Sequence, residues 1–291
     1  MPPEASEASL RPIQVVVPCF NEADRLRSEA FVAWLAANPE WHLRFVDDGS
    51  SDGTADAVRA IVAAAGDRQA SLQILETNQG KAEAVRQGLL AAIRDGAEFV
   101  GFFDADLATP LDDLIRLLEP LRKDPRLEMA MGSRIQMLGR SVRRRIGRHY
   151  AARGIANLAA LALDLPVHDT QCGAKLMRNS AALRNAVATP FSSRWVFDME
   201  LIQRIGQHVR GHGIADPAVV FLEVPVSSWT EVAGSKVRFV DAVIATTKLW
   251  GIYRNRRAFE RTLAAPTRVV EIEVGREEQA PATAGAAASD S

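Results

Sequence analysis

Two aspartates, Asp104 and Asp106, follow directly after an apolar run that ends in Phe102-Phe103. The run has the length and composition of a buried strand, so both carboxylates would leave its carboxyl end, where open α/β sheets bind their ligands. In extended geometry residues two apart point to the same side. Paired carboxylate oxygens suit a hard divalent cation that also binds substrate phosphates. The alternative is a strand-end turn with solvated acids, because an isolated Asp-x-Asp is common by chance.

Polar clusters also follow the three earlier apolar runs. They are Pro18-Cys19-Phe20-Asn21-Glu22, then Asp47-Asp48-Gly49-Ser50-Ser51-Asp52-Gly53-Thr54, then Asn78-Gln79-Gly80-Lys81. A strand-end acid can accept hydrogen bonds from a base or ribose, and a glycine and a cation at a helix start suit phosphate or ribose contacts. Taken alone, the second cluster is better explained as a turn with a helix cap at Asp52 or Thr54. Because four clusters would fall on one edge of a sheet, a nucleotide site is favoured.

These positions depend on an alternation of strands and helices. In the first half, strands are expected at 13–17, 43–46, 72–75 and 99–103, and helices at 23–36, 54–64, 81–94 and 111–122. In the second half, helices are expected at 142–163, 197–209 and 237–261, and a strand at 219–224. This order predicts an α/β fold with a mostly parallel sheet and helices on both faces.

Composition narrows the class of protein. The 291 residues are 47% hydrophobic, and the formal net charge of −1 gives no general attraction for nucleic acid. The two cysteines, Cys19 and Cys172, and the polar opening Met1 to Pro12 argue for free thiols in a reducing compartment. No apolar stretch has the length of a membrane-spanning helix. We therefore expect a soluble or peripheral protein without an N-terminal anchor.

The order of the motifs resembles the family-2 glycosyltransferases, which have the Rossmann-like GT-A fold. Three later segments look most like the dolichyl-phosphate β-glucosyltransferases, with the dolichyl-phosphate mannosyltransferases a little more distant. They are Asp169-Thr170-Gln171-Cys172-Gly173-Ala174-Lys175-Leu176, Arg194-Trp195-Val196-Phe197-Asp198-Met199-Glu200-Leu201 and Trp229-Thr230-Glu231-Val232-Ala233-Gly234-Ser235-Lys236. The resemblance covers roughly residues 12–260. It implies a flexible arm at 1–11, one domain at 12–264 and a mostly disordered tail at 265–291. The domain would have a nucleotide-sugar half (12–134) and an acceptor and membrane-facing half (135–264).

The resemblance also implies roles for individual residues. The nucleotide-sugar site would contain Pro18, Asn21, Glu22, Asp47, Asp48, Gly80, Lys81, Asp104, Ala105 and Asp106. The metal, Mg²⁺ or Mn²⁺, would be held by Asp104 and Asp106. The sugar and acceptor would meet Arg134, Gln171, Arg194, Trp195, Asp198, Glu200 and Lys236. The residues closest to the chemistry would be Asp106, Arg134, Asp169, Asp198 and Lys236.

The reaction implied is inverting transfer of glucose from UDP-glucose to a polyprenyl phosphate. A phosphate acceptor is already anionic near neutral pH, so it needs cations more than a general base. The rival donor is GDP-mannose. A glycolipid or soluble hydroxyl acceptor would instead need a base, for which Asp198 or Glu200 could serve. A non-catalytic nucleotide-sugar-binding protein is disfavoured, because Asp104, Asp106 and Arg134 are all present.

Basic residues alternate with apolar ones in two later segments. The first contains Arg140, Arg143, Arg144, Arg145, Arg148 and Arg153, and the second is the expected helix at 237–261 with Phe239, Trp250 and Tyr253 among its apolar residues. Basic amphipathic helices suit an anionic membrane surface. We expect a peripheral position on the cytoplasmic face of a membrane. The same pattern would also fit helices that pack into the core, or that bind a small membrane-protein partner.

Overall fold

Seven strands form one mixed sheet in the order β3-β2-β1-β4-β7-β5-β8. The computed structural model describes residues 12–135, 141–143, 165–194 and 196–230. The strands are β1 (Ile13–Cys19), β2 (Trp41–Asp47), β3 (Ala70–Ile74), β4 (Phe99–Phe103), β5 (Met129–Ser133), β7 (Ala174–Arg178) and β8 (Phe221–Pro225). Only β7 runs antiparallel to its neighbours β4 and β5; the other pairs are parallel. The other six strands therefore end at one edge of the sheet, which we call the carboxyl edge.

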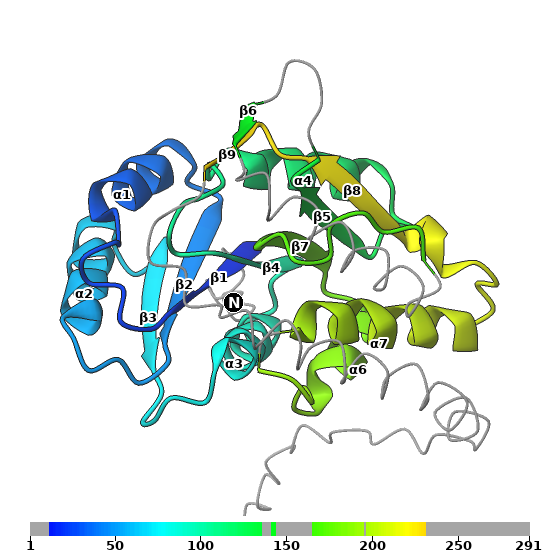
Figure 1. Cartoon of the computed structure of the whole chain (residues 1–291), viewed down its shortest axis with the longest axis horizontal. Coiled ribbons are helices and arrows are strands. Elements are labelled where there is room, and N and C mark those ends of the chain that lie inside the picture. Colours follow the sequence, from blue (N-terminus) through cyan, green and yellow to red (C-terminus); the bar gives the residue numbers. More distant parts are fainter. Residues whose placement is uncertain (1–11, 136–140, 144–164, 195, 231–291) are drawn as a thin grey trace, which may run out of the picture.

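Helices cover both faces of the sheet, as the alternation predicts. Against one face lie α1 (Ser28–Ala37), α2 (Thr54–Ala65) and α4 (Asp113–Lys123). Against the other lie α3 (Lys81–Arg94), α6 (Ala181–Ala188) and α7 (Phe197–Gly211), which Figure 1 shows together below the strands. Both faces of β4 are thus buried, which explains its continuous apolar run.

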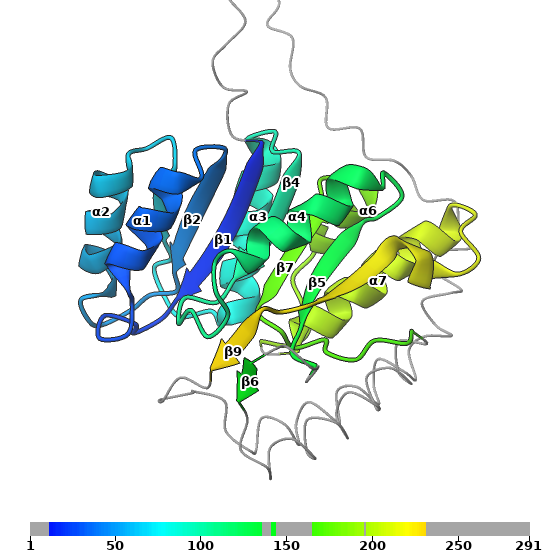
Figure 2. The same ribbon diagram turned by 90° about the horizontal axis from the view of Figure 1, so that it is seen from above.

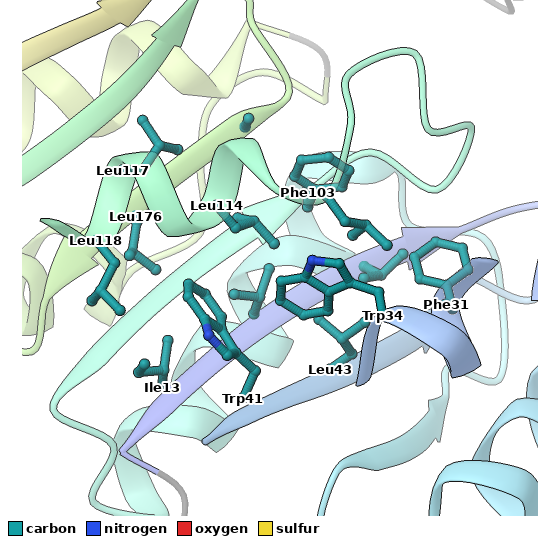
Figure 3. Close-up of a cluster of buried hydrophobic side chains, with 14 of the residues drawn as sticks. Ile13, Phe31, Trp34, Trp41, Leu43, Phe103, Leu114, Leu117, Leu118 and Leu176 are labelled. Atoms are coloured by element: carbon teal, nitrogen blue, oxygen red, sulfur yellow. The ribbon is translucent and has the colours of Figure 1, made fainter. Parts of the chain in front are cut away.

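Large side chains fill the layer between the sheet and α1, α2 and α4 (Figure 3). The rings of Trp34 and Trp41 meet edge to face with their centroids 5.3 Å apart. The indole of Trp34 also donates to Asp112 at 3.0 Å, which ties α1 to the residue just before α4. Each fully buried side chain of this size contributes roughly 1.5–3 kcal/mol, so this layer gives the carboxyl edge a rigid support.

A short two-stranded ladder lies beyond the carboxyl edge, near the end of β5 (Figure 2). It pairs β6 (Ser141–Arg143) with β9 (Ser228–Thr230) in parallel. The N–H of Thr230 donates to the carbonyl of Ala108 at 3.0 Å. The Asp113 carboxylate at the start of α4 accepts from the N–H and the hydroxyl of Ser227 at 3.0 Å. The residues after Asp106 are therefore tied to β9.

Two of the predicted helices do not begin where the sequence predicts. The helix predicted from residue 142 begins wrongly, because Ser141–Arg143 is a strand; its remainder and the helix predicted at 237–261 lie outside the described residues. The helix at 23–36 begins only at Ser28, because the N–H groups of Arg25 and Leu26 turn back onto the carbonyl of Glu22. Periodicity does not predict the short elements β5, β7 and α6. No helix in the described part of the chain is long and apolar enough to cross a membrane.

Candidate active site

The first carboxylate of the Asp-x-Asp pair is held by a lysine. Asp104 follows β4, and its Oδ1 lies 2.5 Å from Nζ of Lys81, the first residue of α3. Burial alone would raise the pKa of Asp104, but the ammonium of Lys81, with weaker effects of Lys175 and Arg134, keeps it below its ordinary value. Asp104 is therefore ionised at neutral pH and already neutralised locally.

Gly173 makes room for the Asp104 carboxylate. The backbone N–H of Asp104 donates to the Gly173 carbonyl at 3.1 Å. A Cβ at position 173 would lie 1.9 Å from Oδ2 of Asp104, which no real contact permits. The loop before β7 thus fixes where this carboxylate points.

The second carboxylate of the pair, Asp106, has no cation in direct contact among the described residues. Its Oδ1 accepts from the N–H of Ala108 at 3.0 Å, and it forms no ion pair with any described residue. Burial raises the pKa of Asp106 above its ordinary value, and the neighbouring charge of Asp104 raises it further. A partly buried carboxylate beside a second one fits a divalent cation, because the cation would relieve both causes of the shift. No cluster of three metal-binding side chains occurs among the described residues, so substrate or water oxygens would complete the coordination.

A carboxylate and a guanidinium hold the turn at residues 78–80 from opposite sides. Asp48 accepts from the N–H groups of Gln79 and Gly80 at 2.7 and 2.8 Å. Arg194 donates to the carbonyls of Gln79 and Asn78 at 2.8 and 2.9 Å. Burial raises the pKa of Asp48, although these hydrogen bonds and Arg194 oppose the rise. The sequence predicts Arg194 among the residues that meet the sugar and acceptor, and the structure shows its guanidinium bonded to the turn that precedes Lys81.

The remaining residues predicted for the nucleoside pocket surround the ends of β1 and β2. Asp47 accepts from the N–H and hydroxyl of Ser50 at 3.0 and 2.5 Å, as expected of a strand-end turn. Asn21 has a φ of 49° and accepts from the N–H of Ser51 at 2.9 Å. Glu22 pairs with Arg25, and Pro18 is half-buried at the end of β1. Together they form a polar rim beside Asp48.

On the other side of the carboxyl edge, two acids position an arginine. Asp169 receives Nε and Nη2 of Arg134 at 2.7 and 2.8 Å and also its backbone N–H at 2.9 Å. Glu223 on β8 accepts from the N–H groups of His168 and Asp169 at 2.9 and 2.8 Å. Burial would lower the pKa of Arg134, but Asp169 raises it above its ordinary value. The guanidinium also lies 5.7 Å from the centre of the Trp229 ring, so Arg134 is fixed in place.

The two acids expected near the sugar are both committed to other groups. Oδ1 of Asp198 lies 2.6 Å from Nζ of Lys175, which is 0% exposed. Glu200 accepts from the N–H and hydroxyl of Ser192 at 2.8 and 2.7 Å and from Arg204 at 2.6 Å. Each therefore already serves as the partner of a neighbouring donor.

Four other predicted residues add less to this geometry. Gln171 is exposed on the loop before β7, and Ala105 is buried between the two aspartates. Trp195 and Lys236 lie outside the described residues. Cys172 is fully buried, and burial raises its pKa to about 11, so its thiol stays protonated at neutral pH.

Sequence reasoning missed Lys175 and Glu223 as site-forming residues. Glu223 is the single charge of the strand Phe221–Pro225, and Lys175 is the charge inside the strand Ala174–Arg178, which ends in a second one at Arg178. A lone charge in such a run is a usable signal, because a buried charge needs a partner. The sequence pattern alone does not identify the partner of that charge.

The carboxyl edge therefore combines an Asp-x-Asp pair, a backbone turn at a helix start and a set of paired cations. This combination on a mostly parallel sheet defines an α/β enzyme of the nucleotide-binding class. Residues 14–184 match the model of glycosyl transferase family 2. The chain belongs to this family, as the motifs predicted, and it is a glycosyltransferase.

Characterised relatives support the same assignment. Dolichyl-phosphate beta-glucosyltransferase of Mus musculus is 31% identical over 252 residues, covering 81% of this chain and 72% of the relative. The enzyme of the same name from Dictyostelium discoideum is 28% identical, covering 77% and 68%. Polyprenol monophosphomannose synthase of Mycolicibacterium smegmatis is 26% identical, covering 84% and 90%.

Solved structures confirm the fold. Glucosyl-3-phosphoglycerate synthase of Mycobacterium tuberculosis, in complex with phosphoglyceric acid, aligns with a TM-score of 0.57 at 20% identity. The match covers 84% of this chain and 80% of that one. The same enzyme with Mn²⁺, UDP and glucosyl-3-phosphoglycerate gives a TM-score of 0.52 over 87% and 80%. The similarity establishes a GT-A-like arrangement of strands and helices.

Proposed function

We propose that this glycosyltransferase moves glucose, with inversion, from UDP-glucose to a polyprenyl phosphate of the dolichyl type. The names of the relatives support both the sugar and the lipid phosphate. One observation on this chain carries the choice of acceptor. Asp198 and Glu200, the acids available to activate a hydroxyl, are engaged by Lys175 and by Ser192 with Arg204. An acceptor that is already anionic needs no such base.

The side chains of the carboxyl edge would then have separate roles. Asp106, with Asp104, would hold Mg²⁺ or Mn²⁺, which stabilises the charge that develops on the departing nucleoside diphosphate. Asp48 and the 78–80 turn would place the nucleoside, while Lys81 would contact the diphosphate. Arg134, fixed by Asp169 and Trp229, would receive the acceptor phosphate and keep two anions close together.

The acceptor would come from a membrane, and we propose that the enzyme works at its cytoplasmic face. The lipid phosphates in the names of the relatives and the basic, apolar segments of the sequence support this position. Those segments, apart from residues 141–143, lie outside the described residues. A small membrane-protein partner is the other means of reaching the lipid.

A donor panel tests the proposal. Purified enzyme with Mg²⁺ or Mn²⁺ is given UDP-glucose or GDP-mannose, and polyprenyl phosphate in anionic vesicles, free glycosides or no acceptor. We expect lipid-linked glucose and UDP release only with UDP-glucose and the lipid, and enzyme that floats with the vesicles. Asp106→Asn should lower turnover at least ~10²-fold while the fold persists. Preference for GDP-mannose would replace the sugar assignment, and faster transfer to free glycosides would overturn the acceptor.

A further inference from the structure

The Asp-x-Asp pair already contains an internal cation. The ammonium of Lys81 lies 2.5 Å from Oδ1 of Asp104, and both side chains reach solvent, with exposed fractions of 26% and 38%. This ion pair neutralises the charge of Asp104 when no ligand is bound.

The other cations near Asp104 have acids of their own. Lys175 is fully buried and pairs with Asp198, and Arg134 pairs with Asp169 at two atoms. Among the described residues, only Lys81 forms an ion pair with Asp104. Unlike Lys175, Lys81 is partly exposed, and its ammonium lies on a flexible four-carbon stem that can move towards another anion.

A divalent cation shared by Asp104 and Asp106 would compete with Lys81 for the negative charge of Asp104. Such a metal ion would bring two further positive charges within a few ångströms of the ammonium, and like charges at that distance repel. The ammonium and the metal ion would therefore weaken each other's binding to Asp104.

We infer that Lys81 is the exchangeable resident cation of the metal site: it neutralises Asp104 until a divalent cation displaces it, and the released ammonium then pairs with the diphosphate of the donor. The inference rests on the proposed function, which supplies the divalent cation and the nucleotide-sugar donor. It adds that Lys81 weakens metal binding when no nucleotide is present. It also adds that metal and nucleotide bind cooperatively. The metal ion would move Lys81 towards the diphosphate, and the diphosphate would hold Lys81 away from the metal site.

Titration of Mn²⁺, followed by its electron paramagnetic resonance signal, measures this competition without turnover. The variants are Lys81→Met, Lys81→Arg and Lys123→Met, each with and without UDP. Lys81→Met should bind Mn²⁺ alone about tenfold more tightly than the parent enzyme, and UDP should strengthen its Mn²⁺ binding less. Lys81→Arg keeps the cation and should bind Mn²⁺ as weakly as the parent. Lys123 pairs only with exposed Glu119 on α4, so Lys123→Met controls for loss of a lysine.

The outcomes separate this inference from the proposed function. If Lys81→Met binds Mn²⁺ no more tightly than the parent, while UDP and Mn²⁺ still bind, the exchange is wrong and the proposed function stands. If neither the parent nor Lys81→Met binds Mn²⁺ with or without UDP, the metal role in the proposed function fails, and the inference fails with it. A circular dichroism spectrum unlike the parent's would disqualify Lys81→Met, and Lys81→Gln would then provide the same comparison.

Discussion

Removal of the ammonium of Lys175 should destabilise this protein more than the loss of any surface lysine. Lys175 is 0% exposed and Asp198 is 7% exposed, and Nζ lies 2.6 Å from both Oδ1 of Asp198 and the Cys172 carbonyl. The ammonium also lies 5.1 Å from the centre of the Phe102 ring. Lys175→Met keeps the apolar stem but leaves a buried carboxylate unpaired, which costs about 3–5 kcal/mol. The unsatisfied carbonyl is part of that total, at about 1–3 kcal/mol.

Urea unfolding, followed by tryptophan fluorescence, measures this cost. The double variant Lys175→Met/Asp198→Leu removes both charges and should recover most of the lost free energy of unfolding, because an apolar pair can replace a buried ion pair. The matched control is Lys123→Met, where the side chains of Lys123 and its partner Glu119 are 72% and 63% exposed, and it should change stability by less than about 1 kcal/mol. A Lys175→Met variant within about 1 kcal/mol of the parent would refute this account of the buried pair.

Two further predictions concern the loop before β7. Gly173→Ala should lower turnover at least ~10²-fold, since its Cβ would lie 1.9 Å from Oδ2 of Asp104 and must move that carboxylate; parent-like kinetics would show that this carboxylate is not fixed by the loop. Burial raises the pKa of Cys172 from 9.0 to about 11, so above pH 9 the unfolded thiol ionises while the folded one keeps its proton, and stability falls as the pH rises towards 11. Between pH 8 and 10.5 the parent should therefore lose about 2 kcal/mol more than Cys172→Ala in urea titrations, and equal losses would contradict the burial of this thiol.

The sequence identifies the parts of this site that depend on local order. Asp104 and Asp106 adjoin an apolar run, and Gly80-Lys81 opens a periodic helix, so strand ends and helix starts place them without knowledge of the rest of the chain. The mostly parallel sheet follows from the same alternation. The antiparallel β7 does not, because a short apolar run specifies a strand but neither its neighbours nor its direction.

Pairing between distant residues is the part that could not be predicted. Arg134 and Asp169 are 35 positions apart, and Lys175 and Asp198 are 23 apart. Their contacts exist only because β5, β7 and α7 meet at the carboxyl edge. For the same reason the sequence does not predict that Arg194 donates to the carbonyl of Gln79, 115 positions away. The residue type specifies the positive charge of Arg194, but the position of its guanidinium depends on the partners that the fold brings within reach.

The pairing of charges would also allow one edge to bind the two anionic substrates of the proposed reaction. Cations left unpaired would repel one another in the absence of ligand, so the fold gives each its own acid: Lys81 has Asp104, and Arg134 has Asp169. Each of these pairs is partly exposed, which allows a phosphate to replace the carboxylate as partner. Lys175 is fully buried and has no such freedom, so it supports the site without exchanging partners. Asp106 forms no ion pair with any described residue, and a divalent cation there would balance the charge that the second phosphate brings.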